Sequence, residues 1–357
     1  MDLNIALEFG VILFCLLVGT RYGGFGLGLV SGIGVLVFAF VFHLQPGKPP
    51  VDVLLTIMSV LGCASVLQTA GGLNVMMRFA EKILRRHPNQ ITLLAPLTTW
   101  SLTVMCGTGH VVYTMFPIIY DIAIKKGIRP ERPMAVASIA SQIGICASPV
   151  SVAIVSMVAI LSKAPNFSIN LLQLLSIGMP ATLCGVIVAA LWSMNRGKDL
   201  DKDPEFQARI QDPMQKDYIY GETATLLDKV FPKEAYWATW IFFSAIGIVV
   251  LLGAFPDLRP MLGAVGKAKP LSMNLVIQMM MLSAGAIILM TCKVKPQEIP
   301  NGTVFKAGMV AVVSIFGVAW MADTVFEAHF TLLKQTLSGV VQVYPWTYAL
   351  VLFITSK

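Results

Sequence analysis

The chain alternates long apolar blocks with short polar connections. Most blocks run for roughly 15–25 residues, the length that lets a helix cross about 30 Å of hydrocarbon. The blocks that fit one full crossing cover residues 3–20, 24–42, 53–70, 171–194, 235–255, 271–292 and 307–324. Helices satisfy all their backbone groups internally, so this pattern predicts an all-α polytopic membrane protein.

One segment has a different pattern. Between Asn74 and Arg86, apolar and basic residues both recur at helical spacing, which is typical of an amphipathic helix lying in the membrane interface. The apolar members are Val75, Met76, Phe79 and Ile83, and the basic members are Arg78, Lys82, Arg85 and Arg86.

Residues 91–124 hold two apolar stretches that are too short for a full crossing, Ile91–Met105 and Val111–Ile124. They are joined by Cys106-Gly-Thr-Gly-His110, whose small and polar residues cannot face lipid with unpaired backbone groups. A re-entrant helical hairpin with its tip inside protein explains both features. Two short tilted spans with an ordinary loop remain the alternative.

A long block from Met134 to Leu161 is interrupted near Gly144 and at Ser148-Pro149. Proline removes a backbone donor and disfavours helix in the residue before it, so this span is expected to be kinked or unwound there.

The polar stretch Arg196–Glu234 separates two membrane halves with the same order of blocks. We therefore expect a first repeat over 1–195 with its hairpin at about 91–124, a cytoplasmic linker over 196–234, and a second repeat over 235–357. By analogy with the first half, Trp346–Lys357 is the first arm of a second hairpin, so the second repeat is expected to be truncated.

Composition supports a membrane location, because 56% of the 357 residues are hydrophobic, 13% are charged and the mean hydropathy is +0.75. With the N-terminus in the periplasm, the inside loops of the first half carry nine basic residues and the outside loops two, Lys48 and Lys163. The nine are Arg21, Arg78, Lys82, Arg85, Arg86, Lys125, Lys126, Arg129 and Arg132. This bias follows the positive-inside rule, places the two repeats in inverted orientation, and explains the net charge of +7 without nucleic acid.

No enzyme signature is present. The sequence lacks a nucleophile elbow, an HExxH helix and a Walker lysine, and the missing Walker lysine also argues against ATP-driven pumping by this chain itself. The six cysteines show no CxxC spacing and are read as small packing residues, so no cofactor and no metal site is expected.

Inverted-repeat carriers bind their substrates where broken helices expose helix ends near the membrane midplane. The candidate substrate-binding residues lie at the hairpin tip and in the broken span. They are Gly107, Thr108, Gly109, His110, Ser141, Gln142, Ser148, Pro149 and Ser151. Glycines admit a ligand close to the backbone and hydroxyls donate to anions, although small residues also serve helix packing in membranes.

Four residues carry further hypotheses. His110 is a candidate proton carrier or carboxylate partner, or a hydrogen-bonded structural histidine. Asp323 and Thr324 end an apolar span and are candidates for ion coupling or a second site, unless Asp323 simply reaches the outer interface. Lys357 would place a cation at the second hairpin.

Six strings of this sequence closely resemble the Dcu family of anaerobic C4-dicarboxylate transporters, A/B type. They are His43-Leu-Gln-Pro-Gly-Lys-Pro-Pro-Val-Asp52, Cys106-Gly-Thr-Gly-His-Val-Val-Tyr-Thr114, Pro117-Ile-Ile-Tyr-Asp121, Arg129-Pro-Glu-Arg-Pro-Met134, Ala147-Ser-Pro-Val-Ser-Val152 and Arg196-Gly-Lys-Asp-Leu-Asp-Lys-Asp203. The resemblance implies exchange of fumarate, malate and aspartate against succinate across the bacterial inner membrane. It also implies an ion-transporter-like fold with paired hairpins, and a homo-oligomer or a sensor kinase as partner.

Within this reading, Thr108, His110 and Ser148 are expected to hold one carboxylate, with the second on the other hairpin. Two alternatives remain open. One is a sodium- or proton-coupled carboxylate importer, and the other is a transport-inactive membrane partner of a sensor kinase.

Overall fold

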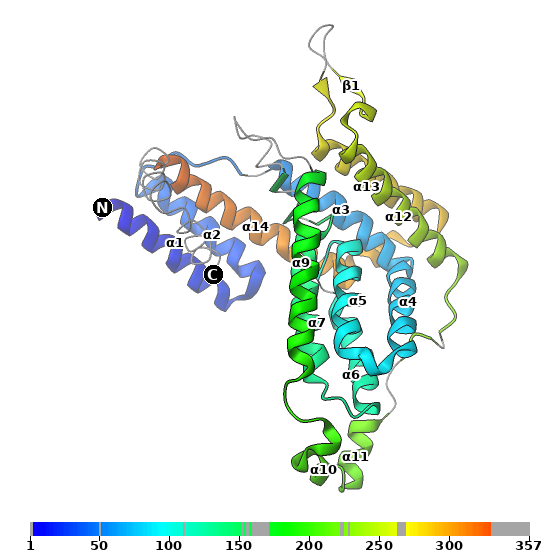
Figure 1. Ribbon diagram of the computed structural model, residues 1–357. Coiled ribbons are helices and arrows are strands. Elements are labelled where there is room, and N and C mark those ends of the chain that lie inside the picture. Colours follow the sequence, from blue (N-terminus) through cyan, green and yellow to red (C-terminus); the bar gives the residue numbers. More distant parts are fainter. Residues whose placement is uncertain are drawn as a thin grey trace. The chain divides into compact units, whose positions relative to one another are not determined.

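The computed structural model describes residues 3–49, 51–109, 111–151, 153–154, 157–158, 171–221, 225–227, 229–262 and 269–329. Nearly all regular structure in these ranges is helical (Figure 1). Seven of the described helices are long and apolar enough to cross a membrane. They are α1 (Leu3–Arg21), α2 (Gly23–Phe40), α3 (Val51–Thr69), α9 (Leu171–Met194), α12 (Lys233–Ala254), α13 (Met273–Thr291) and α14 (Thr303–Ala328). The predicted helical polytopic membrane protein is confirmed.

The remaining elements are shorter. The α-helices among them are α4 (Gly72–Arg86), α5 (Ile91–Cys106), α6 (Val111–Lys125), α7 (Glu131–Gly144), α10 (Pro204–Arg209) and α11 (Pro213–Tyr220). The 3-10 turns are η1 (Pro88–Gln90), η2 (Ile145–Ala147), η3 (Leu200–Lys202), η4 (Pro256–Leu258) and η5 (Pro296–Asn301). One antiparallel pair, β1 (Met261–Leu262) with β2 (Lys269–Pro270), was not predicted from the hydropathy pattern.

The polar segment after α9 forms two short helices, α10 and α11, with the same start signal. The carboxylate of Asp203 accepts a hydrogen bond from the Glu205 amide at 3.1 Å, and that of Asp212 accepts one from the Met214 amide at 3.0 Å. In each case proline follows the capping aspartate, where its missing N–H costs nothing and its fixed φ suits a helix.

The chain divides into two compact units, and each is described by itself. Unit 1 comprises residues 1–54 and 309–357, and unit 2 comprises residues 55–308. The core of unit 1 contains Cys15, Val35, Phe38, Met321 and Val325, so α1, α2 and α14 share one buried centre.

Two glycines let α2 and α14 cross closely within unit 1. A methyl group added at Gly28 would overlap the carbonyl oxygen of Val313, and one added at Gly317 would overlap the backbone of Gly28. Small residues at such crossings are the usual means of close helix packing in membranes.

The loop before α3 is held to the end of α14, also within unit 1. The indole N–H of Trp320 donates to the Gly47 carbonyl at 2.7 Å. The Gly47 amide donates to the Thr324 hydroxyl at 3.1 Å, and the Lys48 amide donates to the Asp323 carboxylate at 3.0 Å. Just beyond the same end of α14, His329 contacts the carboxylate of the buried Glu8.

Unit 2 is built around α5, which packs against α7, α9 and α4. α7 in turn packs against α6 and α9, and α12 packs against α13, α4 and α9 (Figure 1). The helices that carry the predicted hairpin and the predicted break therefore lie in one bundle.

The amphipathic character of α4 is confirmed, and its buried residues are only in part those of the predicted apolar stripe. Met76, Met77, Ala80 and Leu84 are buried, whereas Phe79 is 68% exposed. The helix has apolar residues on two sides, and it packs against α12, α5 and α6.

Candidate substrate site

The predicted hairpin tip lies between two helices. α5 ends at Cys106, and Gly107 caps it with φ of 73° while its amide donates to the Thr103 carbonyl at 2.8 Å. Non-glycine residues rarely adopt this left-handed conformation, so the position requires glycine. α6 begins at Val111. His110 lies outside the described residues.

The predicted break in the following span is also present. α7 ends at Gly144, the turn η2 covers Ile145–Ala147, and Ser148 is extended with φ of −93° and ψ of 126°. Helix resumes after Ser151, whose hydroxyl accepts from the Ile154 amide at 3.2 Å and donates to the Ile145 carbonyl at 2.6 Å. Ser151 thus acts as the N-cap of the helix that continues the span.

The tip and the break are in contact. A methyl group added at Gly107 would lie 3.0 Å from the Val150 carbonyl oxygen. One added at Gly109 would lie 2.9 Å from the Gln142 amide nitrogen and 3.1 Å from the Ser141 carbonyl oxygen. The structure therefore brings together the two regions that the sequence analysis selected independently.

α5 and α9 hold the break in place. Gly144 lies against α5, since an added methyl would be 3.0 Å from the Thr103 side chain and 3.1 Å from the Trp100 carbonyl. On the other side, a methyl at Gly178 of α9 would be 2.6 Å from the Cys146 carbonyl. The Trp100 indole N–H donates to the Thr182 hydroxyl at 3.2 Å and joins α5 to α9 directly.

The candidate side chains differ in how accessible they are. Ser141, Ser148 and Ser151 are buried, and their hydroxyls bond backbone groups of the break or of α7. Thr108 is half-buried and Gln142 is exposed. The serines thus stabilise the broken backbone in this conformation, and their contact with a substrate stays a prediction.

The junction between tip and break has no charged side chain in its sequence, residues 107–109 and 141–151. Its electrostatics come from helix ends instead. Two amides at these helix starts already have partners, since the Val112 amide donates to the Gly109 carbonyl at 3.3 Å and the Ile154 amide to the Ser151 hydroxyl at 3.2 Å. Helix N-termini of this kind carry partial positive charge. This arrangement can receive a carboxylate without a buried lysine or arginine.

The other candidates lie elsewhere. Asp323 and Thr324 belong to unit 1, where they bind the loop at Gly47 and Lys48. Lys357 lies outside the described residues. All six cysteines are free, and within the described ranges no three His, Cys, Asp or Glu side chains are grouped as they would be to hold a metal ion.

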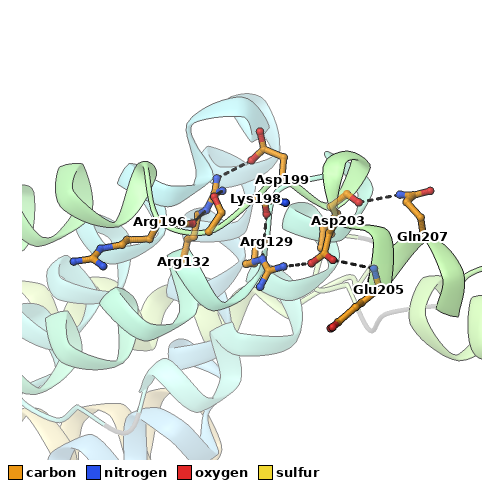
Figure 2. A network of polar contacts seen from close by, with 10 residues as sticks. Arg129, Arg132, Arg196, Lys198, Asp199, Asp203, Glu205 and Gln207 are labelled. Carbon is orange, nitrogen blue, oxygen red and sulfur yellow. Dashed lines mark hydrogen bonds and ion pairs between the residues drawn. The ribbon is translucent and has the colours of Figure 1, made fainter.

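Unit 2 contains two charge networks that were not predicted from the sequence. In the first, Arg132 binds the start of the polar segment through the Asp199 carboxylate at 2.7 Å and the Gly197 carbonyl at 2.8 Å (Figure 2). Arg129 pairs with Asp203 in the same network, and the Leu200 amide donates to the Gly127 carbonyl at 2.9 Å. The connection from α6 to α7 is therefore tied to residues 196–203.

The second network is buried between α4, α6 and residues 225–226. The carboxylate of Glu81 accepts from Arg85 at 2.7 Å, from the Thr225 hydroxyl at 2.6 Å and from the Leu226 amide at 2.9 Å. Arg85 also pairs with Asp121 at 3.0 Å. Burial by itself lowers the pKa of the Arg85 guanidinium, but hydrogen bonds and charge from Glu81 and Asp121 outweigh it, so the net shift in pKa is upward.

Comparison with known proteins shows which family this chain resembles. Residues 4–357 match the family described as "Anaerobic c4-dicarboxylate membrane transporter". The DcuB anaerobic C4-dicarboxylate transporter of Escherichia coli O6:H1 is 53% identical over 97% of this chain and 77% of its own length. The C4-dicarboxylate transporter DcuA of Helicobacter pylori strain 26695 is 36% identical over 98% of this chain and 76% of its own length.

A third relative, DcuA of Wolinella succinogenes, is 35% identical over 98% of this chain and 78% of its own length. No solved structure gives a significant match. The relatives are named as transporters, not as enzymes. On the strength of the match across nearly its whole length, the chain belongs to the DcuA/DcuB family of C4-dicarboxylate membrane transporters.

Proposed function

We propose that this protein exchanges C4-dicarboxylates across the bacterial inner membrane, with fumarate, malate or aspartate entering and succinate leaving. The observation that carries the proposal is the contact between the tip at Gly107–Gly109 and the break at Ser141–Ser151. Two interrupted helices that meet inside a helical bundle are the usual setting of a carrier's binding site.

The proposed binding chemistry relies on neutral donors. One carboxylate of the substrate lies at the positive N-terminal ends of α6 and of the helix after Ser151, with Thr108 and Gln142 as the accessible side chains that donate to it. His110 and Ser148 are further candidate partners of that carboxylate. A site without fixed countercharges suits exchange of fumarate or malate for succinate, because one dianion replaces another and the net charge of the site is restored in each half-cycle.

The proposed architecture is a pair of inverted repeats with re-entrant hairpins and a periplasmic N-terminus. The lengths of α5 and α6, 16 and 15 residues, support it. At about 1.5 Å per residue each spans roughly 24 Å or less, short of the approximately 30 Å of hydrocarbon. A hairpin that enters and leaves on one side fits these lengths.

Three further roles belong to the same proposal. Asp323 and Thr324 are candidates for ion coupling, Lys357 is the candidate cation of the second hairpin, and a sensor kinase or a second copy of the chain is the candidate partner. Replacement of Asp323 by asparagine keeps an oxygen acceptor for the Lys48 amide, so it separates a coupling charge from a loop contact.

The experiment is counterflow with the full chain in proteoliposomes. Vesicles loaded with succinate should accumulate labelled fumarate much faster than empty vesicles, and external malate or aspartate should compete. Uptake that needs a sodium or proton gradient and ignores internal succinate would identify a coupled importer. Absence of flux, with retained binding to a kinase, would identify a transport-inactive partner.

A further inference from the structure

An apolar groove of about 1030 Å³ lies among α4, α5 and α12 of unit 2. α4 contributes Val75, Phe79 and Ile83, which are the residues of the predicted apolar stripe that do not form the packed face of the helix. α5 lines it with Leu97 and neighbouring residues, and α12 with Trp240 and neighbouring residues. Phe79 and Trp240 are each 68% exposed, so the groove is open to the surroundings of the unit.

The serine and threonine hydroxyl groups in this groove are already satisfied. Thr98 donates to the Leu94 carbonyl at 2.8 Å, Ser101 to the Leu97 carbonyl at 2.8 Å, and Thr239 to the Ala235 carbonyl at 2.8 Å. Each bond is made within the residue's own helix. These groups therefore place no demand on an occupant, and most of the groove favours hydrocarbon.

The charged residues that line the groove are two cations of α4, Arg78 and Lys82. Arg78 is half-buried and uses neutral partners: it donates to the Tyr236 hydroxyl at 3.1 Å and to the Leu227 carbonyl at 3.0 Å. Among the residues that the structure describes, neither cation forms an ion pair with a carboxylate. The positive charge at this groove is thus available to an anion.

An occupant must combine a long apolar part with an anionic group. A C4-dicarboxylate fails this requirement because its short chain ends in a carboxylate on both sides. A neutral hydrophobic molecule would leave the two cations uncompensated. We propose that the groove binds an anionic phospholipid, with the phosphate at Arg78 and Lys82 and an acyl chain along Phe79, Leu97 and Trp240.

The proposal uses residues outside the tip and the break and is independent of the transported substrate. Aromatic side chains such as Tyr236 and Trp240 beside basic residues are typical of protein surfaces at the level of lipid headgroups. A bound lipid would join α4 to α5 and α12, and α5 carries the hairpin tip at its end.

The test is lipid retention by the purified full chain, measured by native mass spectrometry and by thermal stability in detergent with added lipid. Phosphatidylglycerol should bind and stabilise, and phosphatidylcholine of the same chain length should do so several-fold less. Each cation is worth about a fivefold change in affinity at a membrane surface, so Lys82→Gln and Arg78→Gln should each weaken phosphatidylglycerol binding by about that factor.

The matched control is Arg86→Gln, which removes an exposed cation of the same helix that does not line the groove and should leave binding unchanged. Because Arg78 also bonds Tyr236, Lys82→Gln keeps the test valid if the Arg78 variant is unstable. Equal retention of the two lipids, equal effects of all three variants, or full competition by glycerol phosphate alone would each overturn the proposal.

Discussion

The Gly107 backbone lies so close to Val150 that a methyl group on its Cα would be 3.0 Å from the Val150 carbonyl oxygen. The two residues belong to segments that the chain separates by the whole of α6 and α7. Their contact joins the hairpin tip to the broken span, and it depends on a glycine in the left-handed conformation with φ of 73°.

Gly107→Ala should therefore destabilise the junction and reduce transport. The left-handed conformation alone costs a residue with a side chain about 1–2 kcal/mol, and the contact with Val150 adds to this. We expect a lower midpoint of thermal unfolding in detergent and a slower rate of exchange. Gly185→Ala in α9 is the control, because an added methyl there meets nothing within 4 Å. Equal behaviour of the two variants would contradict the packing described here.

Arg132→Lys should loosen residues 196–203 while keeping the positive charge. A single ammonium cannot replace a guanidinium that reaches the Asp199 carboxylate, the Gly197 carbonyl and, at 2.5 Å, the Arg196 carbonyl together. We expect trypsin to cleave after Arg196 and Lys198 about fivefold faster or more, from a local loss on the order of 1–2 kcal/mol. The control variant is Arg209→Lys, which changes an exposed residue of α10. Trypsin should cleave it at the same rate as the wild type.

Glu81→Gln should destabilise unit 2. The carboxylate is fully buried and binds three donors, so its neutralisation weakens three hydrogen bonds and leaves Arg85 with Asp121 alone. Breaking a buried ion pair by removing one partner typically costs about 3–5 kcal/mol, which is measured as a fall in the thermal midpoint. Glu298→Gln is the control, since its pair with Lys295 is exposed and 3.6 Å long. A fall of the same size in that variant would argue against a special role for the buried cluster.

This cluster should also resist alkaline pH. The pKa of Arg85 is raised in the folded state, so the stabilisation it gives is fully present below the pKa of the unfolded chain and is lost only above the folded value. Both pKa values of Arg85, folded and unfolded, lie far above the pH range in which membrane proteins are handled. Raising the pH from 7 to 10 should therefore not lower the unfolding midpoint through this residue, and Glu81→Gln should remain less stable throughout.

Gly28→Ala should separate α2 from α14 in unit 1. The added methyl would overlap the Val313 carbonyl, and overpacking of this kind typically costs about 1–3 kcal/mol. Gly32→Ala lies one turn further along the same helix and meets nothing within 4 Å, so it should be neutral. The folded yield and the thermal midpoint of both variants are measured together. Unchanged values for Gly28→Ala would contradict the close packing of α2 against α14.

Much of the fold could be predicted from the sequence because membrane crossing imposes a length and a hydropathy on each helix. Block 171–194 and helix α9 (Leu171–Met194) share the same bounds. The break after Gly144 was predictable from glycine and proline chemistry, and the extended Ser148 confirms it. These signals depend only on residues that are close together in the sequence, so they can be recognised without the structure.

The charge networks could not be predicted because their members are far apart in sequence. Arg132 and Asp199 are 67 positions apart, and no periodicity links them. Gly127 and Gly197 gave a weak signal: both adopt left-handed conformations, with φ of 69°, next to the paired charged residues. The packed side of α4 could not be predicted for a similar reason, since the helix has apolar residues on two sides and its contacts with α12, α5 and α6 are all non-local.

The central claim is that the junction of tip and break binds the exchanged dicarboxylate, and Gln142 is its exposed side chain next to Gly109. The most direct measurement is the fumarate concentration that gives half-maximal exchange into succinate-loaded proteoliposomes. A lost hydrogen bond to a charged group is worth about 1.5–3 kcal/mol, so Gln142→Ala should raise this concentration by at least about tenfold. Gln211→Ala, on the exposed polar segment, should leave it unchanged. An unchanged half-saturating concentration in Gln142→Ala would contradict the site proposed for this transporter.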